Sequence, residues 1–321
     1  MKASGPDILE QTEFYAQDVR ILRELGFDVR IVTSPRKLVV ADLYFCWWWT
    51  WAFVPVALAR ALLRPVIVTG VFDLHEFDRR PAAHQALMRY ALRAAAANVF
   101  VSRLEEAQIT RQFNVSSARY VPVGVDTQVY RPNNNVREDD MVLTVAWLQA
   151  GNAERKGVPD AILATELLRR RRPGVRLVIA GERASGYPKL RDLVDRLGVG
   201  DAVAFLGAIP RKEKIDLMQR CKVYIQPSRF EGFGVAILEA MSCGAAVLTR
   251  PVGAIPEVVG DAGFFVGESG VEALEDGLRE LLENRRLRSD LGQRARLRAE
   301  TLFPYERRKR ELAELIEEIL R

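Results

Sequence analysis

The stretch VYIQPSRFEGFGVAILEAMSCGAAVLT, residues 223–249, decides the fold of this chain. A short apolar run at Val223–Ile225 predicts a strand, and the small-residue run from Val235 predicts a helix that ends near Gly244. Another apolar run, Ala246–Thr249, predicts a second strand. Glycines in the intervening loop let the backbone approach a ligand closely, and the free N–H groups of a first helical turn bind anions. The sequence therefore predicts an anion site at this strand-to-helix turn.

Two glutamates flank the predicted anion site. Glu231 precedes the turn, and Glu239 lies about one turn inside the predicted helix. A ligand with its anionic middle on the helix N-terminus would meet one carboxylate at each end, which describes a nucleotide-sugar. The alternative is a solvated loop glutamate and a helix glutamate that only complements the helix dipole.

The stretch resembles a known family. Glu231 and Glu239, eight positions apart, match the E-x7-E motif of retaining glycosyltransferases of the GT-B fold, family 4 (glycosyl transferases group 1) type. PSRFEGFGVAILEAMSCGAAVLT is similar to that family's PS-x-x-EGFG-x-x-x-LEAM-x-x-G-x-PV segment. The resemblance implies that Glu231 binds hydroxyls of the donor sugar and Glu239 binds the ribose hydroxyls. It also assigns Gly232, Phe233, Gly234, Val235 and Ala236 to the donor site.

Composition indicates a globular protein of two domains. The 321 residues are too many for one ordinary core, and 28% of them are charged. Lys and Arg exceed Asp and Glu by only 47 − 42 = 5, and no basic-aromatic array indicates nucleic-acid binding. Three widely spaced cysteines favour a reducing compartment, and two histidines exclude a His-rich metal site. The N-terminus, MKASGPDILEQTEF, lacks the apolar core of a signal peptide.

The order of predicted elements indicates an α/β protein. A βαβ rhythm in both halves predicts two doubly wound, Rossmann-like sheets. The resemblance implies a GT-B fold whose two domains face a cleft, with an abbreviated N-terminal domain, because only Met1–Gly5 could supply the family's first strand and glycine-rich loop. The expected divisions are an acceptor-side domain over 1–137, a donor-binding domain over 138–302, and a terminal helix over 303–321 that returns to the first domain.

The first half contains these expected elements in order: helix 12–25, strand 28–33, strand 39–45, helix 55–63, strand 65–69, helix 82–97, strand 98–102, helix 105–113 and strand 118–122. The second half contains strand 141–146, helix 159–170, strand 175–180, helix 187–197, strand 203–206 and helix 211–220, and after the opening stretch come helices 271–282, 286–301 and 304–320.

The uncharged, tryptophan-rich run LYFCWWWTWAFVPVALA, residues 43–59, has more than one interpretation. Its 17 residues are about the minimum length of a membrane-spanning helix. We favour a buried strand followed by an aromatic loop and a helix. The indoles either pack at a core edge or line an acceptor pocket or a membrane interface. Trp47 is the candidate acceptor-side residue of this run.

Further donor-site residues come from the resemblance. Lys156-Gly157 matches the family's lysine-glycine, whose lysine contacts the donor diphosphate, and a flexible ammonium suits that role. The family's upstream arginine is replaced by Trp147, which leaves Arg155 as a substitute. Gly207 and Ile209 resemble the turn whose backbone touches the base. The alternative for Lys156 is a solvated loop lysine.

The acceptor side departs from the family. Many members place a histidine just after the strand at 65–69, where this chain has Phe72. His75 follows a few residues later and is a candidate acceptor-side residue together with Asp73, although a surface-loop histidine is the alternative.

The sequence thus predicts transfer of a hexosyl group from a nucleotide-diphosphate sugar to an acceptor hydroxyl, with retention. Lys156 and Glu231 are the candidate catalytic residues. No cofactor or metal is expected, since no Asp-x-Asp motif stands out. The expected partners are a nucleotide-sugar and an unidentified glycan, lipid or metabolite acceptor, in the cytoplasm or at the inner face of the membrane as a peripheral protein. The rival hypotheses are a donor-binding but catalytically idle module that serves a partner, and a protein that inserts its tryptophan-rich run into the membrane.

Overall fold

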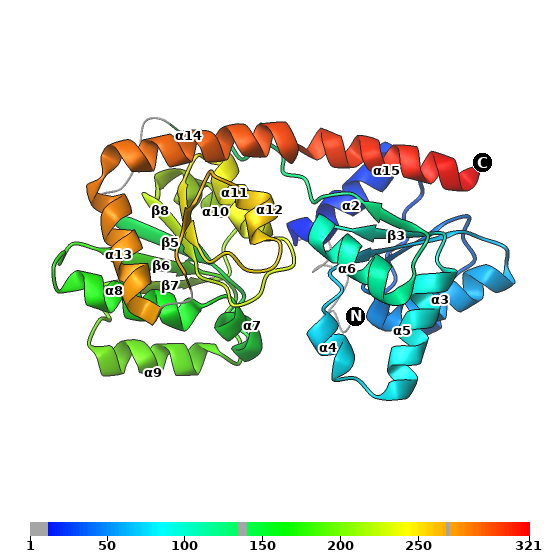
Figure 1. Ribbon diagram of the computed structural model, residues 1–321, viewed down its shortest axis with the longest axis horizontal. Helices are drawn as coiled ribbons and strands as arrows, with labels where there is room; N and C mark the ends of the chain where they lie inside the picture. Colours follow the sequence, from blue (N-terminus) through cyan, green and yellow to red (C-terminus); the bar gives the residue numbers. More distant parts are fainter. Residues whose placement is uncertain (1–11, 134–139, 268–269) are drawn as a thin grey trace. The chain divides into compact units, whose positions relative to one another are not determined.

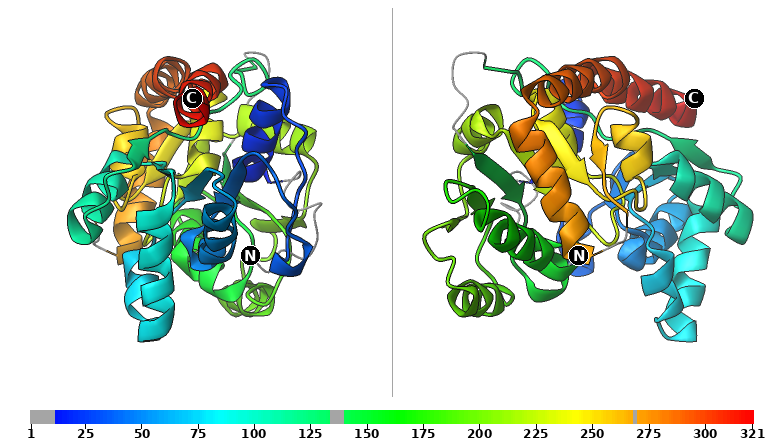
Figure 2. Two further views of the ribbon diagram at one scale, coloured as in Figure 1. Left: turned by 90° about the vertical axis from the view of Figure 1, so that its right-hand side faces the viewer. Right: turned by 60° about the vertical axis from the view of Figure 1, so that its left-hand side comes forward.

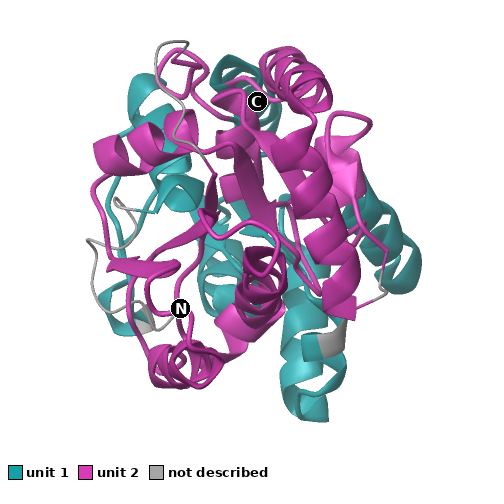
Figure 3. Cartoon of the chain, turned by 90° about the vertical axis from the view of Figure 1, so that its left-hand side faces the viewer, with its two compact units in different colours: residues 1–124, 305–321 teal, residues 125–304 magenta. Residues whose placement is uncertain are grey.

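The computed structural model describes residues 12–133, 140–267 and 270–321 (Figure 1). The chain forms two compact units, Met1–Gly124 with Tyr305–Arg321, and Val125–Pro304 (Figure 3). The change of unit thus comes at 124, not at 137. Tyr130 explains part of this difference, because it is fully buried and its carbonyl accepts a 2.6 Å hydrogen bond from Ser242 Oγ in the second unit.

The first unit is built on a four-stranded parallel sheet in the order β1-β2-β3-β4. Parallel neighbours require crossover connections, which the intervening helices supply. The strands are β1 (Tyr44–Trp47), β2 (Val66–Gly70), β3 (Ala97–Phe100) and β4 (Ala118–Tyr120).

Helices cover both faces of this sheet. One apolar cluster joins the sheet to α3 (Trp49–Ala61), α5 (Ala82–Ala94) and α6 (Arg103–Phe113). The other joins it to α2 (Glu13–Glu24) and to the last helix, α15 (Tyr305–Leu320). The first unit is therefore doubly wound and includes the C-terminal helix. It also contains α4 (Leu74–Asp78) and a 3-10 turn at Pro35–Lys37.

Two predicted strands of the first unit were wrong or misplaced. Residues 28–33 form no strand and their backbone makes no hydrogen bond in the described part of the chain. An isolated extended segment is not a strand without a partner ladder, and β1 pairs with β2 alone. The strand predicted over 39–45 begins only at Tyr44. Val40, which lies within the predicted range, is 71% exposed.

The tryptophan-rich run divides between β1 and α3, as favoured from the sequence, but the expected aromatic loop is a single residue. Trp48 has φ 73° and turns the chain directly from the strand into α3. The helix therefore starts at Trp49 instead of Pro55, and Trp49 is buried in the core. Among the described residues, no helix has the length and apolar character that crossing a membrane requires.

The second unit is built on a six-stranded parallel sheet in the order β10-β9-β8-β5-β6-β7. Its strands are β5 (Met141–Val145), β6 (Arg176–Ala180), β7 (Val203–Gly207), β8 (Val223–Gln226), β9 (Ala246–Thr249) and β10 (Phe264–Phe265). The first strand, β5, lies in the middle of the sheet, so that the chain winds outward in both directions from it.

One apolar cluster of this unit lies between the sheet and helices that include α8 (Val158–Arg169) and α13 (Gly270–Glu283), which pack side by side (Figure 2). The remaining helices are α7 (Ala150–Arg155), α9 (Tyr187–Leu197), α10 (Arg211–Arg220), α11 (Val235–Ser242), α12 (Ile255–Val259) and α14 (Arg285–Leu302).

The predicted elements of the second unit were largely confirmed. The bounds of α9 and α10 are those expected, since Gly198 ends α9 in the left-handed conformation and Pro210 precedes α10. The short helices α7 and α12 and the two-residue strand β10 were missed. Helix α7 lies in the connection between β5 and α8, and its N-terminus is capped by the side chain of Gln149.

Candidate functional site

The loop between β8 and α11 forms the centre of the candidate site. Gly234 directly precedes α11 and has φ 95°, in the left-handed region that favours glycine. No side chain caps this helix, so the N–H groups of its first turn are not satisfied by a cap. An anion site at this turn stays a prediction, and Gly234 and the first turn without a side-chain cap are the features that it requires.

Lys156 and Glu231 come together from loops that are 75 residues apart in the sequence. Lys156 Nζ donates to Glu231 Oε2 at 2.5 Å, and Arg155 Nη1 lies 3.7 Å from Glu231 Oε1. The side chains of Lys156 and Glu231 are 13% and 8% exposed. Gln226 Nε2 also donates to Oε2, at 3.0 Å. The two candidate catalytic residues are thus direct partners.

The surroundings keep the Glu231 carboxyl ionised. Burial acts to raise its pKa, but the positive charges of Lys156 and Arg155 outweigh that effect, together with hydrogen bonds from Lys156 and the Phe233 backbone. The pKa of Glu231 therefore lies below its ordinary value. An ionised carboxylate accepts hydrogen bonds only, which suits the binding of sugar hydroxyls.

Two glycines let neighbouring loops lie against this site. A Cβ on Gly157, at φ 70°, would be 2.2 Å from the carbonyl oxygen of Pro227. A Cβ on Gly253, at φ 54°, would be 2.1 Å from the carbonyl oxygen of Glu231. The N–H of Ala254 donates to that same oxygen at 3.0 Å. The backbone around Glu231 is therefore fixed by close contacts that a side chain at either glycine would prevent.

A buried ion pair that was not anticipated from the sequence supports the same loop. Arg250 Nη1 donates to Asp160 Oδ2 at 2.8 Å and to the Pro227 carbonyl at 2.9 Å. Asp160 is in the first turn of α8, and both side chains are mostly buried. Nothing in the local sequence signals this pair, because its members are 90 positions apart.

Glu239 has a lysine partner of its own, which the sequence reasoning also missed. Lys214 Nζ donates to Glu239 Oε1 at 2.6 Å, and the carboxylate is nearly buried. Lys214 is in the first helical turns of α10, directly after the Gly207 turn. The sequence gives one local indication of this partner, a lysine a few residues after the Gly207 turn.

The other predicted donor-site residues lie in the turn after β7 and at the start of α11. Gly207 ends β7 with φ 79°, and its carbonyl accepts from Gly181 N at 2.9 Å. Ile209 is half-buried in the turn before α10. Phe233 is buried against Phe303, with ring centroids 5.7 Å apart, and so packs as a core residue. Gly232, Val235 and Ala236 are half-buried around the start of α11.

The acceptor-side candidates lie in the first unit and have structural contacts there. Trp47 Nε1 donates to Asp18 Oδ2 at 3.0 Å, and Asp73 caps α4 by accepting from Glu76 N at 3.1 Å. His75 belongs to α4, but its side chain lies outside the described residues. Phe72, at the position where the family resemblance expects histidine, is buried among aromatic rings.

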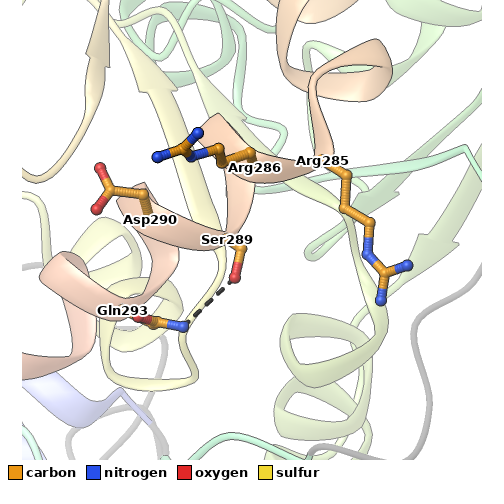
Figure 4. Close-up of a pocket in the computed structure, with 5 residues that line it drawn as sticks. All are labelled: Arg285, Arg286, Ser289, Asp290 and Gln293. Atoms are coloured by element: carbon orange, nitrogen blue, oxygen red, sulfur yellow. Dashed lines mark hydrogen bonds between the residues drawn. The ribbon is translucent and has the colours of Figure 1, made fainter.

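Two pockets lie outside the candidate site. One, of about 520 Å³, lies on the surface of α14 between Arg285 and Gln293 (Figure 4). Its five lining residues come from one helix, and Gln293 Nε2 donates to Ser289 Oγ at 3.4 Å. The other, of about 510 Å³, lies in the first unit between residues 27–34 and the edge of β1. Within the described ranges, no group of three or more His, Cys, Asp or Glu side chains has a metal-binding arrangement.

Comparison with curated proteins identifies relatives among glycosyltransferases. Residues 130–298 match the family model for glycosyl transferases group 1. The O-antigen chain mannosyltransferase B of Escherichia coli is 29% identical over 246 residues, which cover 72% of this chain and 64% of that protein. A D-inositol 3-phosphate glycosyltransferase of Saccharomonospora viridis is 31% identical over 218 residues, 61% of this chain and 50% of that protein. The chain thus spans less than two thirds of these two relatives.

A third relative is matched over more of its length. The GDP-mannose-dependent alpha-(1-6)-phosphatidylinositol monomannoside mannosyltransferase of Mycolicibacterium smegmatis is 30% identical over 297 residues. This match covers 84% of the present chain and 75% of the relative.

Solved structures show the same fold. Sucrose-phosphate synthase from Thermosynechococcus elongatus aligns with a TM-score of 0.77 at 22% identity, covering 87% of this chain and 73% of that one. The Anabaena protein HepE in complex with UDP-glucose aligns with a TM-score of 0.74 at 20% identity, covering 86% and 79%. These neighbours have the GT-B fold, which confirms the predicted fold class of two Rossmann-like domains with parallel sheets. Since the family model matches more than half of the chain and the mycolicibacterial relative is 30% identical over 84% of it, the chain belongs to the glycosyl transferases group 1 family.

Proposed function

We propose that the protein transfers a hexosyl group from a nucleotide-diphosphate sugar to an acceptor hydroxyl with retention of configuration. The observation that carries the proposal is the convergence of Lys156, Glu231 and the uncapped N-terminus of α11 in one part of the second unit. Two of the relatives described above are named as mannosyltransferases, one of them GDP-mannose-dependent, and the structural neighbour HepE was solved in complex with UDP-glucose. These names support a hexose as the transferred group and a nucleotide diphosphate as the leaving group.

The leaving diphosphate is the part of the reaction for which this site is best suited. The bond from the anomeric carbon to the phosphate oxygen breaks, the acceptor oxygen bonds to that carbon on the same face, and the acceptor proton passes to the departing diphosphate. Negative charge grows on the diphosphate, and the Lys156 ammonium and the N–H groups of Gly234, Val235 and Ala236 would stabilise it. Because these groups supply positive charge, the proposed reaction needs no metal ion.

The two glutamates would bind the two ends of the donor. Glu231 would accept hydrogen bonds from hydroxyls of the transferred sugar, for which its lowered pKa keeps it ionised. Glu239 would accept hydrogen bonds from the ribose. Lys156 is already paired with Glu231, so donor binding would exchange that carboxylate for a phosphate oxygen as the partner of the ammonium.

Donor binding and turnover test this proposal separately. Thermal stabilisation by UDP-, GDP- and ADP-sugars identifies the donor, because a ligand that binds the folded protein raises its melting temperature. Release of nucleotide diphosphate is then measured in wild type, Lys156→Ala, Glu231→Gln and Glu239→Gln, with and without EDTA. Loss of release in the variants and no effect of EDTA are expected. Wild-type rates in all three variants would contradict the assignment, and loss of activity in EDTA would contradict metal independence.

A catalytically idle donor-binding module is the second candidate, and one observation favours it. Phe72 is buried at the position where the resemblance expects a histidine near the reacting sugar, and its ring packs on Trp49 and Phe77. Nucleotide-sugar binding without release of nucleotide diphosphate, for any donor and acceptor, would support this candidate over the transferase.

The proposal also includes the acceptor and the cellular location of the protein. Asp73, His75 and Trp47 stay candidates for the acceptor side, and the acceptor is a glycan, a lipid or a small metabolite. Peripheral association with the inner face of a membrane is proposed from the exposed aromatic and aliphatic side chains of α3 and its end, since Trp51 is 51% exposed and Leu63 is 92% exposed. Co-sedimentation with anionic vesicles that Trp51→Ser reduces would support it, and absence of binding by wild type would contradict it.

A further inference from the structure

The carboxylate of Glu239 has a fixed ammonium beside it. Lys214 Nζ lies 2.6 Å from Glu239 Oε1, with the two side chains 19% and 4% exposed. In the described part of the chain, Oε2 of Glu239 has no hydrogen bond from another residue. The Lys214 ammonium thus pairs with one of the two carboxylate oxygens.

An aromatic ring restricts where this ammonium can lie. Lys214 Nζ is 5.4 Å from the centroid of the Tyr130 ring, and Arg211 Cζ, one helical turn earlier, is 5.2 Å from the same centroid. Tyr130 is fully buried in the second unit. A cation held over an aromatic face and against a carboxylate has two attractive partners, so its position is better defined than that of a solvated lysine.

The pair matches the hydrogen-bonding capacity of a vicinal diol. A carboxylate accepts and an ammonium donates, whereas each hydroxyl both donates one hydrogen bond and accepts others. A lone carboxylate satisfies the hydroxyl protons and leaves the hydroxyl oxygens without donors. With Lys214 beside Glu239, a hydroxyl can donate to the carboxylate and accept from the ammonium.

We propose that Lys214 is a donor-binding residue that completes the ribose site with Glu239 and makes the protein discriminate a ribose diol from a deoxyribose. The proposal rests on the proposed function, because it takes from it the placement of the ribose at Glu239. It assigns to Lys214 a hydrogen bond to one of the two ribose hydroxyl oxygens. The alternative is that Lys214 only neutralises and orients Glu239 and does not contact the ligand.

The test measures affinity for a nucleoside diphosphate and for its 2′-deoxy and 3′-deoxy analogues, with UDP or GDP chosen by the donor screen. Lys214→Met removes the ammonium and keeps most of the side-chain length. We expect it to weaken binding of the ribonucleotide about tenfold, equivalent to about 1.4 kcal/mol. The affinity of Lys214→Met for one of the two deoxy analogues should differ from that of wild type by less than threefold. The variant should therefore prefer the ribonucleotide less than wild type does. Lys214→Arg, which keeps a donor there, should retain part of that preference.

Controls separate this inference from the proposed function. Lys212→Met changes an exposed lysine in the same turn of α10 and should leave all affinities unchanged, while melting temperatures verify folding. Equal weakening of ribo and deoxy ligands in Lys214→Met, or no weakening of either, would overturn the contact. If Glu239→Gln loses ribose discrimination while Lys214→Met keeps it, only the Lys214 inference fails. If wild type binds no nucleoside diphosphate, the proposed function itself fails.

Discussion

The ammonium of Lys156 lies 2.5 Å from Oε2 of Glu231, and the second carboxylate oxygen faces Arg155 at 3.7 Å. This arrangement balances the charge of the buried Glu231 carboxylate. Withdrawing two charges from water carries a desolvation cost that only close pairing and further hydrogen bonds offset. Pairing with Lys156 therefore offsets part of the cost of burying the Glu231 carboxylate.

Removal of Lys156 should destabilise the protein as well as weaken donor binding. In Lys156→Met, Glu231 stays buried with Gln226 and the more distant Arg155, and breaking a buried pair costs about 3 kcal/mol. The double variant Lys156→Met/Glu231→Gln removes the uncompensated charge and should recover part of that loss. Urea unfolding measures both. If the double variant were as unstable as the sum of the single changes, the pair would not be coupled.

Much of the second unit could be predicted because its boundaries are set by local chemistry. Gly198 in the left-handed conformation ends α9, Pro210 precedes α10, and Gly234 precedes α11. These residues act within one turn of the position they determine, so the sequence alone places the helix ends.

What could not be predicted depends on partners distant in the sequence. The extended residues 28–33 have the alternation of a strand, but a strand exists only where a neighbouring ladder accepts it. Lys214 and Glu239 are 25 positions apart, and Lys214 is one of several charged residues on a polar helix. The contact of Lys214 with Glu239 depends on how α10 packs against α11, which the local sequence does not indicate.

The close approach of Gly157 to Pro227 gives a prediction with a matched control. Gly157→Ala introduces a Cβ 2.2 Å from a carbonyl oxygen, whereas Gly198→Ala at a similar φ of 65° meets nothing within 4 Å. Both variants lose about 1–2 kcal/mol because the left-handed backbone disfavours alanine. Gly157→Ala should lose about 1–3 kcal/mol more, since the chain around Lys156 must shift, and it should also bind the donor more weakly. Equal melting temperatures of the two variants would contradict this contact.

The carboxyl of Glu105 should make stability depend on pH. It accepts a hydrogen bond from the N–H of Phe72, its Oε2 is buried without a partner in the described part of the chain, and burial raises its pKa to about 8. The nearby charge of Asp73 raises it further, and the hydrogen bond from Phe72 lowers it. An unfolded glutamate has a pKa of about 4.3. Between these values the folded protein binds a proton that the unfolded chain has released, so stability falls as pH rises from about 4.3 to 8.

Glu105→Gln tests this dependence, because glutamine is a neutral isostere that keeps the acceptor for Phe72. The free energy of unfolding of the variant should exceed that of wild type by a margin that widens from pH 5 to pH 8 and is smallest near pH 4. Urea unfolding across this range measures the margin. Parallel profiles of the two proteins would show that Glu105 is ionised in the folded state throughout.

Arg308 should be the polar residue on which the first unit depends most. Its guanidinium pairs with Asp18, with 2.7 Å between Nε and Oδ1, and both side chains are fully buried. Nη1 also donates to the carbonyls of Val121 and Pro122, at 2.8 and 3.0 Å. One side chain thereby connects α15, α2 and the segment after β4. Arg308→Met leaves Asp18 charged and buried, which should cost about 3–5 kcal/mol.

Two further variants separate charge from geometry at Arg308, and a third changes another residue of the helix as a control. Arg308→Lys keeps the charge, but an ammonium cannot reproduce the planar array of donors that reaches a carboxylate and two carbonyls, so it should recover only part of the loss. Asp18→Asn/Arg308→Met removes both charges and should be more stable than Arg308→Met alone, which a double-mutant cycle in urea measures. Arg310→Met changes an exposed residue of the same helix and should have little effect. Amide exchange in α15 should accelerate in Arg308→Met and not in Arg310→Met. Equal exchange in these two variants would mean that apolar packing alone holds α15 in place and that the buried pair contributes no net stability.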